Sequence, residues 1–258
     1  MPLSLFVTDL DHTLVGDKHA LGILNEHLRL LRQEKGTRIV YSTGRSLSLY
    51  QALASNTDLL EPDALIAAVG AEIYHTHHSQ FILDHNWSKK IALSWDRQQV
   101  VHIASQFPRL VAQPKTEQRP FKASYFLAQA EAATVIAQLT EKLDNSGLKT
   151  QIIYSSGRDL DILPIGANKG LAMQFLQQTW QIAPANTIAC GDSGNDLALF
   201  ANEHLDRLGT PQAKGIIVGN AQPELRQWHE ANPSAARYMA TTPVAAGILE
   251  GLRHFGFL

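Results

Sequence analysis

Two aspartates near the start of the chain, Asp9 and Asp11, have the residue type and the spacing of a pair that could bind a cation. They follow the apolar run 5–7, which is typical of a strand buried inside a parallel sheet. On an extended chain, side chains two positions apart point the same way, and like charges so close repel unless a cation or a proton lies between them. We therefore predict a metal site at the carboxyl end of this strand, where open α/β sheets bind ligands. The alternative is a polar loop in which Asp11 only stabilises a turn.

A second acidic stretch, GDSGND at 191–196, follows the apolar run 187–190. Asp192 and Asp196 lie on a glycine-rich turn, and Asn195 adds an amide oxygen. Oxygen ligands of this kind suit Mg²⁺, which takes few carboxylates and keeps several waters. The stretch lacks the further spaced acids and the closing glutamate of an EF-hand, which disfavours a calcium loop. We predict a magnesium motif.

Two further stretches have the residue types of a phosphate site. Thr43 and Gly44 follow a predicted strand at 38–41 and would present a hydroxyl and backbone amides to an anion. Lys169 would begin a helix capped by Asn168, at the end where the helix dipole disfavours a cation unless a ligand needs it. Two plainer interpretations stay open: a serine that only caps the helix after Gly44, and a lysine that lies on the surface.

The elements that would position these residues alternate between strands and single helices in the first and last parts of the chain. This order predicts an α/β core with a parallel sheet, made of residues 1–80 and 165–258. Residues 81–164 instead follow the order helix, strand, strand, twice over, with helices predicted at 88–107 and 130–145. That order is typical of an antiparallel sheet with helices on one face, so we predict an inserted α+β domain.

Four polar residues outside these motifs could contact a substrate. Glu72 follows a predicted strand at the same sheet edge, where its carboxylate could accept hydrogen bonds from sugar hydroxyls. Lys122, Arg158 and Asp161 lie in the insert. A solvated turn or an ordinary polar sheet face accounts for the local pattern equally well. The histidines at positions 75, 77 and 78 are interpreted as a polar connector, because no matching metal ligands follow at a useful spacing.

Composition narrows the class of protein. An apolar fraction of 45% in 258 residues is ordinary for a soluble globular protein, and a formal charge of −2 disfavours a nucleic-acid binder with a basic surface. Cys190 is the single cysteine, so no intrachain disulfide can form, and its small neighbours predict a core position. We see neither a bilayer-spanning apolar run nor a secretory leader, and we expect a cytoplasmic protein.

The sequence DLDHT at 9–13 resembles the DxDxT signature of the haloacid dehalogenase-like phosphatases. The resemblance implies a Rossmann-like core with a parallel sheet, and a C2-type cap formed by the insert. It also implies that Asp9 is the nucleophile and Asp11 the general acid and base. Thr43, with Gly44 beside it, would hold the phosphoryl group, and Lys169 would pair with the nucleophile and the phosphoryl group.

The same resemblance implies a magnesium cofactor. Asp192 would bind the Mg²⁺ ion directly, and Asp196 would bind it through water or support Lys169. The complete set of implied metal ligands is Asp9, Asp11, Asp192 and Asp196.

Longer stretches narrow the resemblance to the sucrose-phosphate phosphatase group. They are AVGAEIY at 68–74, SSGRDLDILP at 155–164 and GNAQPEL at 219–225. The resemblance implies hydrolysis of sucrose 6-phosphate to sucrose and phosphate through an aspartyl-phosphate, the last step of sucrose synthesis. The sugar-binding candidates that it implies are Glu72, Lys122, Arg158, Asp161 and Asn220.

Other interpretations stay open. Another C2-capped phosphatase, acting on a mannosylglycerate phosphate or a trehalose phosphate, or a phosphomutase, would use the same core residues. A non-catalytic sugar-phosphate-binding module that regulates a synthase would not need the nucleophile, acid, lysine and metal motifs together. We expect a small sugar phosphate as the ligand and a monomer, without nucleic acid or membrane as partner. A sucrose-phosphate synthase is a candidate partner by resemblance, although no motif for it is visible.

Overall fold

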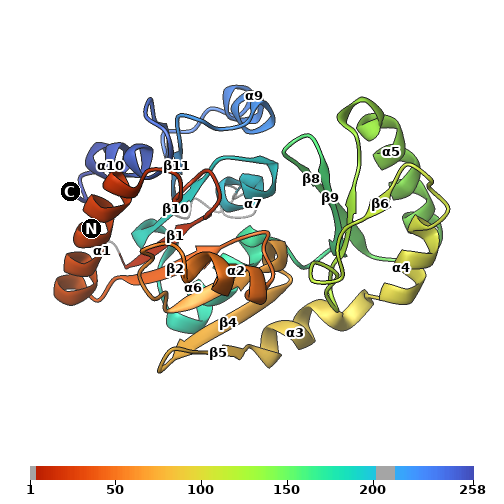
Figure 1. Ribbon diagram of the computed structural model, residues 1–258, viewed down its shortest axis with the longest axis horizontal. Coiled ribbons are helices and arrows are strands. Elements are labelled where there is room, and N and C mark those ends of the chain that lie inside the picture. The colour runs from red at the N-terminus through yellow and green to blue at the C-terminus, as the bar shows by residue number, and fades with distance from the viewer. Residues whose placement is uncertain (1–3, 202–212) are drawn as a thin grey trace.

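The computed structural model describes residues 4–201 and 213–258, which form two β-sheets covered by helices (Figure 1). Within these residues the larger sheet has eight strands in the order β12-β11-β10-β1-β2-β3-β4-β5. Neighbouring strands from β12 to β3 are parallel, whereas β4 is antiparallel to both β3 and β5. This is the α/β core predicted from the order of elements. The strands are β1 (Leu5–Thr8), β2 (Arg38–Ser42), β3 (Ala64–Ala67), β4 (Glu72–His77), β5 (Gln80–Leu83), β10 (Thr187–Gly191), β11 (Lys214–Ile217) and β12 (Arg237–Met239).

Helices cover both faces of the larger sheet. On one face, α1 (Lys18–Lys35) and α10 (Val244–His254) share an apolar cluster with Phe6 of β1 and with Cys190. On the other face, α6 (Lys169–Trp180) shares a second cluster with Leu5 and Val7. Successive side chains of a strand point to opposite faces, so a strand buried on both sides needs apolar residues at every position. This explains the uninterrupted apolar run before Asp9, and it confirms the core position predicted for Cys190.

The insert forms a separate antiparallel sheet, shown at the right of Figure 1. Its described strands have the order β6-β7-β9-β8, and α4 and α5 pack against this sheet through a third apolar cluster. The predicted repetition of helix, strand, strand is therefore confirmed. The elements are α4 (Arg97–Ala104), β6 (Val111–Ala112), β7 (Ala123–Phe126), α5 (Gln129–Asn145), β8 (Thr150–Ser155) and β9 (Asp159–Pro164).

The single helix predicted at 88–107 is wrong, because the chain breaks there into two helices. Asp84 caps α3 (His85–Ile91) by accepting from two backbone amides, and Asp96 caps α4 in the same way through one amide. A short 3₁₀ turn, η2 (Ala92–Ser94), separates the two. Each aspartate satisfies amides that a helix start leaves without partners, which favours two helix starts over one continuous helix. Trp87 of α3 belongs to the apolar cluster of the larger sheet, and its Nε1 donates to the Gly70 carbonyl at 3.0 Å.

Local capping groups also define both ends of α1 and the start of α6. Asp17 accepts from two amides at the start of α1, Gly36 ends α1 in the left-handed region with φ 67°, and Asn168 accepts from an amide of α6. The cap at Asn168 is the one predicted from the sequence. Across the described residues, no helix combines the length and the apolar character of a membrane span. The remaining elements are α2 (Leu47–Ala54), η1 (Ala68–Gly70), η3 (Pro184–Asn186), η4 (Gly194–Asp196), α7 (Leu197–Phe200) and α9 (Pro223–Ala231).

The topology brings the motifs to one edge. β1 lies between β10 and β2, and all three run parallel. Residues that follow these strands therefore emerge side by side at their carboxyl ends, where open α/β sheets bind ligands. Those residues are Asp9 after β1, Thr43 after β2 and Asp192 after β10.

Candidate active site

Three carboxylates meet at the carboxyl ends of β1 and β10. Oxygen atoms of Asp9, Asp192 and Asp196 all lie within 4.8 Å of one another, and all three residues are buried. Asp9 and Asp192 are brought together because Thr8 and Cys190 are register partners in the parallel pair. Among the described residues this group has the composition of a cation site.

Lys169 is the ammonium that this cluster surrounds. Its Nζ donates to Asp9 Oδ1 at 2.8 Å and to Asp196 Oδ1 at 2.7 Å, and its side chain is fully buried. Asn168 caps the helix at this point, so the first residue of α6 is fixed against the strand ends. The cation predicted at a helix start is therefore explained by two carboxylate partners.

Asp196 is held entirely by protein groups. Its Oδ2 accepts from the amides of Asp192 and Ser193 at 3.0 and 3.1 Å, while Oδ1 accepts from Lys169. The turn is tight, since a Cβ on Gly191 would lie 2.5 Å from the Asp196 Cβ. Thr13 donates to Asp192 Oδ1 at 2.7 Å. These hydrogen bonds and the close packing at Gly191 fix the conformation of the loop 191–196.

Burial dominates the electrostatics of the cluster. Burial raises the pKa of Asp9 well above its ordinary value, although the charge of Lys169 opposes the shift. Burial, and after it the charge of Asp196, raises the pKa of Asp192 to about 7. Burial by itself would lower the pKa of Lys169, but the carboxylates of Asp196 and Asp9 outweigh it and raise that pKa. Three buried acids therefore share one ammonium, and the arrangement favours a further cation.

The donor set fits Mg²⁺. The clustered ligand atoms are carboxylate oxygens, with neither sulfur nor imidazole among them in the described chain. Hard oxygen donors of this kind suit Mg²⁺ and Ca²⁺ better than softer metals. The residues that could hold the ion are Asp9, Asp192 and Asp196.

Asp11 is oriented differently from the other predicted ligands. Its two carboxylate oxygens accept from Arg45 Nε and Nη2, each at 2.7 Å, and within the described residues its carboxylate is not part of the three-acid cluster. Both side chains are only partly buried. The paired geometry matches the two donors of a guanidinium to the two oxygens of a carboxylate. The structure therefore places Asp11 beside the cluster and toward the pocket.

A pocket of about 530 Å³ lies between these loops and the cap. The predicted residues Asp9, Asp11, Gly44 and Asp192 line it from the core, and Lys122, Arg158 and Asp161 line it from the cap. Lys169, Asp196 and Thr43 are buried and lie outside its lining. The Thr43 hydroxyl oxygen accepts from the Arg45 amide at 3.1 Å.

The cap contributes a buried polar group to this pocket. Lys122 is 2% exposed, with Nζ 3.3 Å from Asp161 Oδ1 and 3.9 Å from Glu117 Oε2. The same Nζ donates to the Gly44 carbonyl at 3.4 Å, which joins the cap to the turn of the core where phosphate binding is predicted. Ser46 donates to Glu117 Oε1 at 2.9 Å across the same boundary.

Glu72 and Asn220 do not line this pocket. Glu72 begins β4, where it is buried and accepts from the Tyr74 hydroxyl at 2.9 Å and from Arg119 Nε at 2.7 Å. The Asn220 amide donates to the His12 carbonyl at 2.7 Å and accepts from the Val244 amide at 2.9 Å. Glu72 thus connects β4 to the stretch that contains Arg119, and Asn220 connects the turn after β11 to His12 and to the start of α10.

The family model for sucrose-6F-phosphate phosphohydrolase matches residues 2–256 of this chain. The chain belongs to this family. Its core and its inserted four-stranded cap sheet are those of the haloacid dehalogenase superfamily.

Sucrose-phosphatases and related proteins align with nearly the whole length of this chain. Sucrose-phosphatase 2 of Nicotiana tabacum is 39% identical over 97% of this chain, which covers 58% of that relative, so the chain spans about three fifths of its length. The crystal structure of the sucrose-phosphatase from Synechocystis sp. PCC6803, in complex with sucrose and phosphate, aligns with TM-score 0.87 and 41% identity over 99% of this chain and 98% of that one. Mannosylfructose-phosphate phosphatase of Agrobacterium fabrum is 31% identical, with 99% of this chain and 98% of that relative covered.

Sequence reasoning missed two residues of the site in this family member. Arg45 directly follows the predicted Thr43–Gly44 turn, and a cation that follows a strand end next to Asp11 is a usable signal. Glu117 lies in the proline-containing stretch 113–120, between β6 and β7. That stretch lines the pocket through Gln113, Pro114 and Glu117, and no local pattern predicted it.

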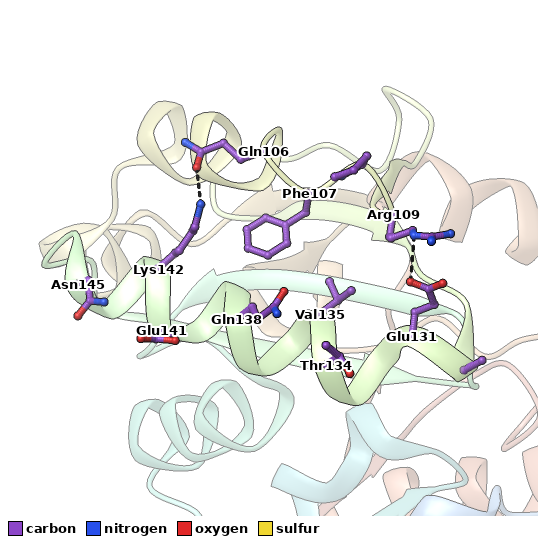
Figure 2. Close-up of a pocket in the computed structure, with 12 residues that line it drawn as sticks. Gln106, Phe107, Arg109, Glu131, Thr134, Val135, Gln138, Glu141, Lys142 and Asn145 are labelled. Atoms are coloured by element: carbon purple, nitrogen blue, oxygen red, sulfur yellow. Dashed lines mark hydrogen bonds and ion pairs between the residues drawn. The ribbon is translucent and has the colours of Figure 1, made fainter.

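A second cavity, of about 700 Å³, lies on the cap beside α5 (Figure 2). Arg109 and Glu131 form an ion pair of 3.1 Å at one end, and Lys142 donates to Gln106 at 2.8 Å at the other. Phe107 lies between these pairs in Figure 2. None of the predicted site residues lines this cavity, so it is separate from the carboxylate cluster.

Proposed function

We propose that this protein is a Mg²⁺-dependent phosphatase that hydrolyses sucrose 6-phosphate to sucrose and phosphate. The observation that carries the proposal is the buried Asp9–Lys169–Asp196 arrangement beneath a pocket that the cap closes. Family membership and the Synechocystis relative, solved with sucrose and phosphate, support the choice of substrate.

Asp9 is the proposed nucleophile. One of its carboxylate oxygens attacks phosphorus, the bond from phosphorus to the sugar oxygen breaks, and an aspartyl-phosphate forms on Asp9. Lys169 holds Asp9 through Oδ1 and adds positive charge next to the phosphoryl oxygens. Thr43 and Gly44 form the turn that receives the phosphoryl group.

Asp11 is the proposed general acid and base. It donates a proton to the departing sugar oxygen, and then takes a proton from the water that hydrolyses the aspartyl-phosphate. Both Asp11 oxygens accept from Arg45 in this structure, so the proton transfer requires that at least one of these hydrogen bonds opens. Arg45 lines the pocket and can turn its freed donors to the substrate.

The metal site is assigned to Asp9, Asp192 and Asp196, of which Asp196 also supports Lys169. When bound, Mg²⁺ supplies positive charge that offsets the repulsion between the nucleophile and the phosphate. Without a cation, the clustered acids would repel an anionic substrate.

The cap residues Lys122, Arg158 and Asp161 are the proposed sugar contacts, with Glu117 beside them. All four line the pocket, and they combine donors and acceptors that match sugar hydroxyls. We propose that the insert 81–164 provides the cap over a core of residues 1–80 and 165–258. At the start of the insert, the end of β5 continues the larger sheet and α3 packs against the core.

Two further proposals follow from the comparisons and from resemblance, one for the substrate and one for a protein partner. The mannosylfructose-phosphate phosphatase relative favours a different disaccharide phosphate as substrate. A sucrose-phosphate synthase is the proposed protein partner, to be tested by co-purification from an extract that contains both proteins.

The test is phosphate release with Mg²⁺ from sucrose 6-phosphate, mannosylfructose phosphate, trehalose 6-phosphate and glucose 6-phosphate, with and without EDTA. Strong preference for sucrose 6-phosphate that EDTA abolishes would support the proposal. Equal rates on all four would keep the phosphatase and contradict the substrate. Tight binding without release from any of them, unchanged in Asp9→Asn, would indicate a binding module instead.

A further inference from the structure

The tip of the β8–β9 hairpin brings cap residues directly over the metal-binding loop. Ser155 pairs with Asp159, and the turn between them contains Ser156 and Gly157 with φ of 54° and 63°. Such paired left-handed residues form a tight hairpin turn. The tip lines the pocket through Ser155, Ser156, Arg158 and Asp159. Its position therefore decides which cap groups face the substrate.

A carboxylate of the core meets this tip. Glu224 lies in the first turn of α9, and its Oε1 accepts from the Ser156 amide at 3.2 Å and from the Gly194 amide at 3.3 Å. Gly194 belongs to the loop 191–196 that contains Asp192 and Asp196. One oxygen atom thus joins the cap hairpin to the loop of the carboxylate cluster. In Figure 1 the β8–β9 hairpin extends from the cap toward the core, and β8 contacts η4 (Gly194–Asp196) at this point.

The backbone at this junction is packed without room for a side chain. A Cβ built on Gly194 would lie 2.9 Å from the Tyr154 carbonyl oxygen of β8 and 3.2 Å from Glu224 Cγ. The absence of a side chain at position 194 allows the hairpin to approach the loop this closely. The junction therefore involves Glu224, Gly194 and the hairpin together.

An acidic residue in the first turn of a helix is common, because it interacts favourably with the helix dipole. Glu224 has that position, but the partners of its Oε1 are amides of two other elements. A carboxylate whose role was limited to its own helix would accept from amides of α9 instead.

We propose that Glu224 is a positioning residue that holds the hairpin tip on the loop 191–196 and thereby sets the affinity for the sugar part of the substrate. The inference rests on the proposed function, since it takes the pocket as the site of a sugar phosphate. It predicts a larger effect on KM for a disaccharide phosphate than on the turnover of a phosphate ester without sugar.

The experiment compares Glu224→Ala, Glu224→Gln and the control Glu230→Gln, which changes an exposed acid of the same helix. Each variant is assayed with Mg²⁺ on sucrose 6-phosphate and on p-nitrophenyl phosphate. Glu224→Ala should raise KM for sucrose 6-phosphate about tenfold, as expected for the loss of charge-assisted hydrogen bonds. Its kcat on p-nitrophenyl phosphate should stay within about twofold of the wild type. Glu224→Gln keeps an oxygen acceptor and should restore most of the affinity.

Amide hydrogen exchange gives a readout that does not depend on the substrate. Peptides that cover 150–158 should exchange faster in Glu224→Ala than in the wild type and in Glu230→Gln. Unchanged KM and unchanged exchange in Glu224→Ala would overturn the inference. So would an equal loss on both substrates that Glu224→Gln does not restore. If the wild type releases no phosphate from sucrose 6-phosphate, the proposed function fails, and the exchange rates alone then support or overturn the positioning role.

Discussion

Glu250 and the cluster of Asp9, Asp192 and Asp196 are carboxylate sites near loops that follow strands of the larger sheet, and they differ in their donors. Glu250 of α10 accepts from the Tyr238 hydroxyl at 2.7 Å and from the amides and hydroxyls of Thr241 and Thr242, which follow β12. Burial by itself would raise its pKa, but the hydrogen bonds from Tyr238, Thr241 and Thr242 outweigh it and lower the pKa to about 2.

In the aspartate cluster, burial dominates and the charges crowd one another. The pKa of Asp192 is raised to about 7 where that of Glu250 is lowered to about 2, although both are carboxylates beside a strand end. A single acid with many neutral donors is satisfied by the fold and stabilises it. Three acids that share one ammonium are not satisfied in this way, because their negative charge exceeds the positive charge beside them. A metal ion can offset this excess, and phosphoryl transfer can use the ion. The comparison distinguishes a carboxylate that stabilises the fold from carboxylates whose charge the fold leaves uncompensated, and four experiments test this distinction.

The largest effect is expected for Asp9→Asn. An amide cannot attack phosphorus as a carboxylate does, so kcat should fall by about 10⁴-fold or more. Steady-state phosphate release measures this, with Glu250→Gln as the matched control that should keep its kcat. Residual turnover above a tenth of the wild type would contradict the nucleophile assignment.

Lys169→Met should destabilise the fold. It leaves Asp9 and Asp196 without their ammonium in a buried site, which costs about 3–5 kcal/mol of the free energy of unfolding. Urea denaturation in EDTA measures the loss, and Lys142→Met, at an exposed position, serves as the control. A change below about 1 kcal/mol would show that the cluster does not depend on this charge.

Mg²⁺ should raise the free energy of unfolding of the wild type, and it should raise it less in a variant that lacks one of the three acids. At about a hundred times its Kd, a ligand of the folded state adds about 2.7 kcal/mol, or roughly 5 °C in Tm. Asp192→Asn should lose this shift, and its own Tm in EDTA should be no lower than that of the wild type, because one repulsive charge is gone. Equal Mg²⁺ shifts in both proteins would place the ion elsewhere.

Glu250→Gln should give the smallest effect, and the size of the effect depends on pH. The folded pKa of Glu250 is about 2 and the ordinary value is 4.5, so its stabilisation is complete above about pH 4.5 and is lost as the pH falls toward 2. At pH 7 the variant should melt about 2–4 °C below the wild type, a modest change because the side chain is partly exposed. Melting curves at pH 7, 5 and 3 should show the gap closing. A gap that widens on acidification would refute the structural role.

Local signals in the sequence determined much of this protein. The apolar run before Asp9, the Asn168 cap, and the alternation of strands and helices predicted elements that the structure confirms. Such signals act within a few residues, through backbone hydrogen bonds and side-chain periodicity, so they can be interpreted without knowing the fold. The motif acids could be placed at strand ends for the same reason.

The contacts between residues that lie far apart in the sequence follow from the tertiary structure. Arg45 and Asp11 are 34 positions apart, Ser46 and Glu117 are 71 apart, and Lys169 reaches Asp9 across 160 positions. Glu72 and Asn220 were predicted as sugar contacts from resemblance. In the structure Glu72 accepts from Arg119, 47 positions away, and Asn220 donates to the His12 carbonyl across 208 positions. Pairings of this kind follow from the sheet order and from the docking of the cap. The sheet order and the docking of the cap both depend on the apolar surface buried over the whole chain, and no single stretch of sequence determines that burial.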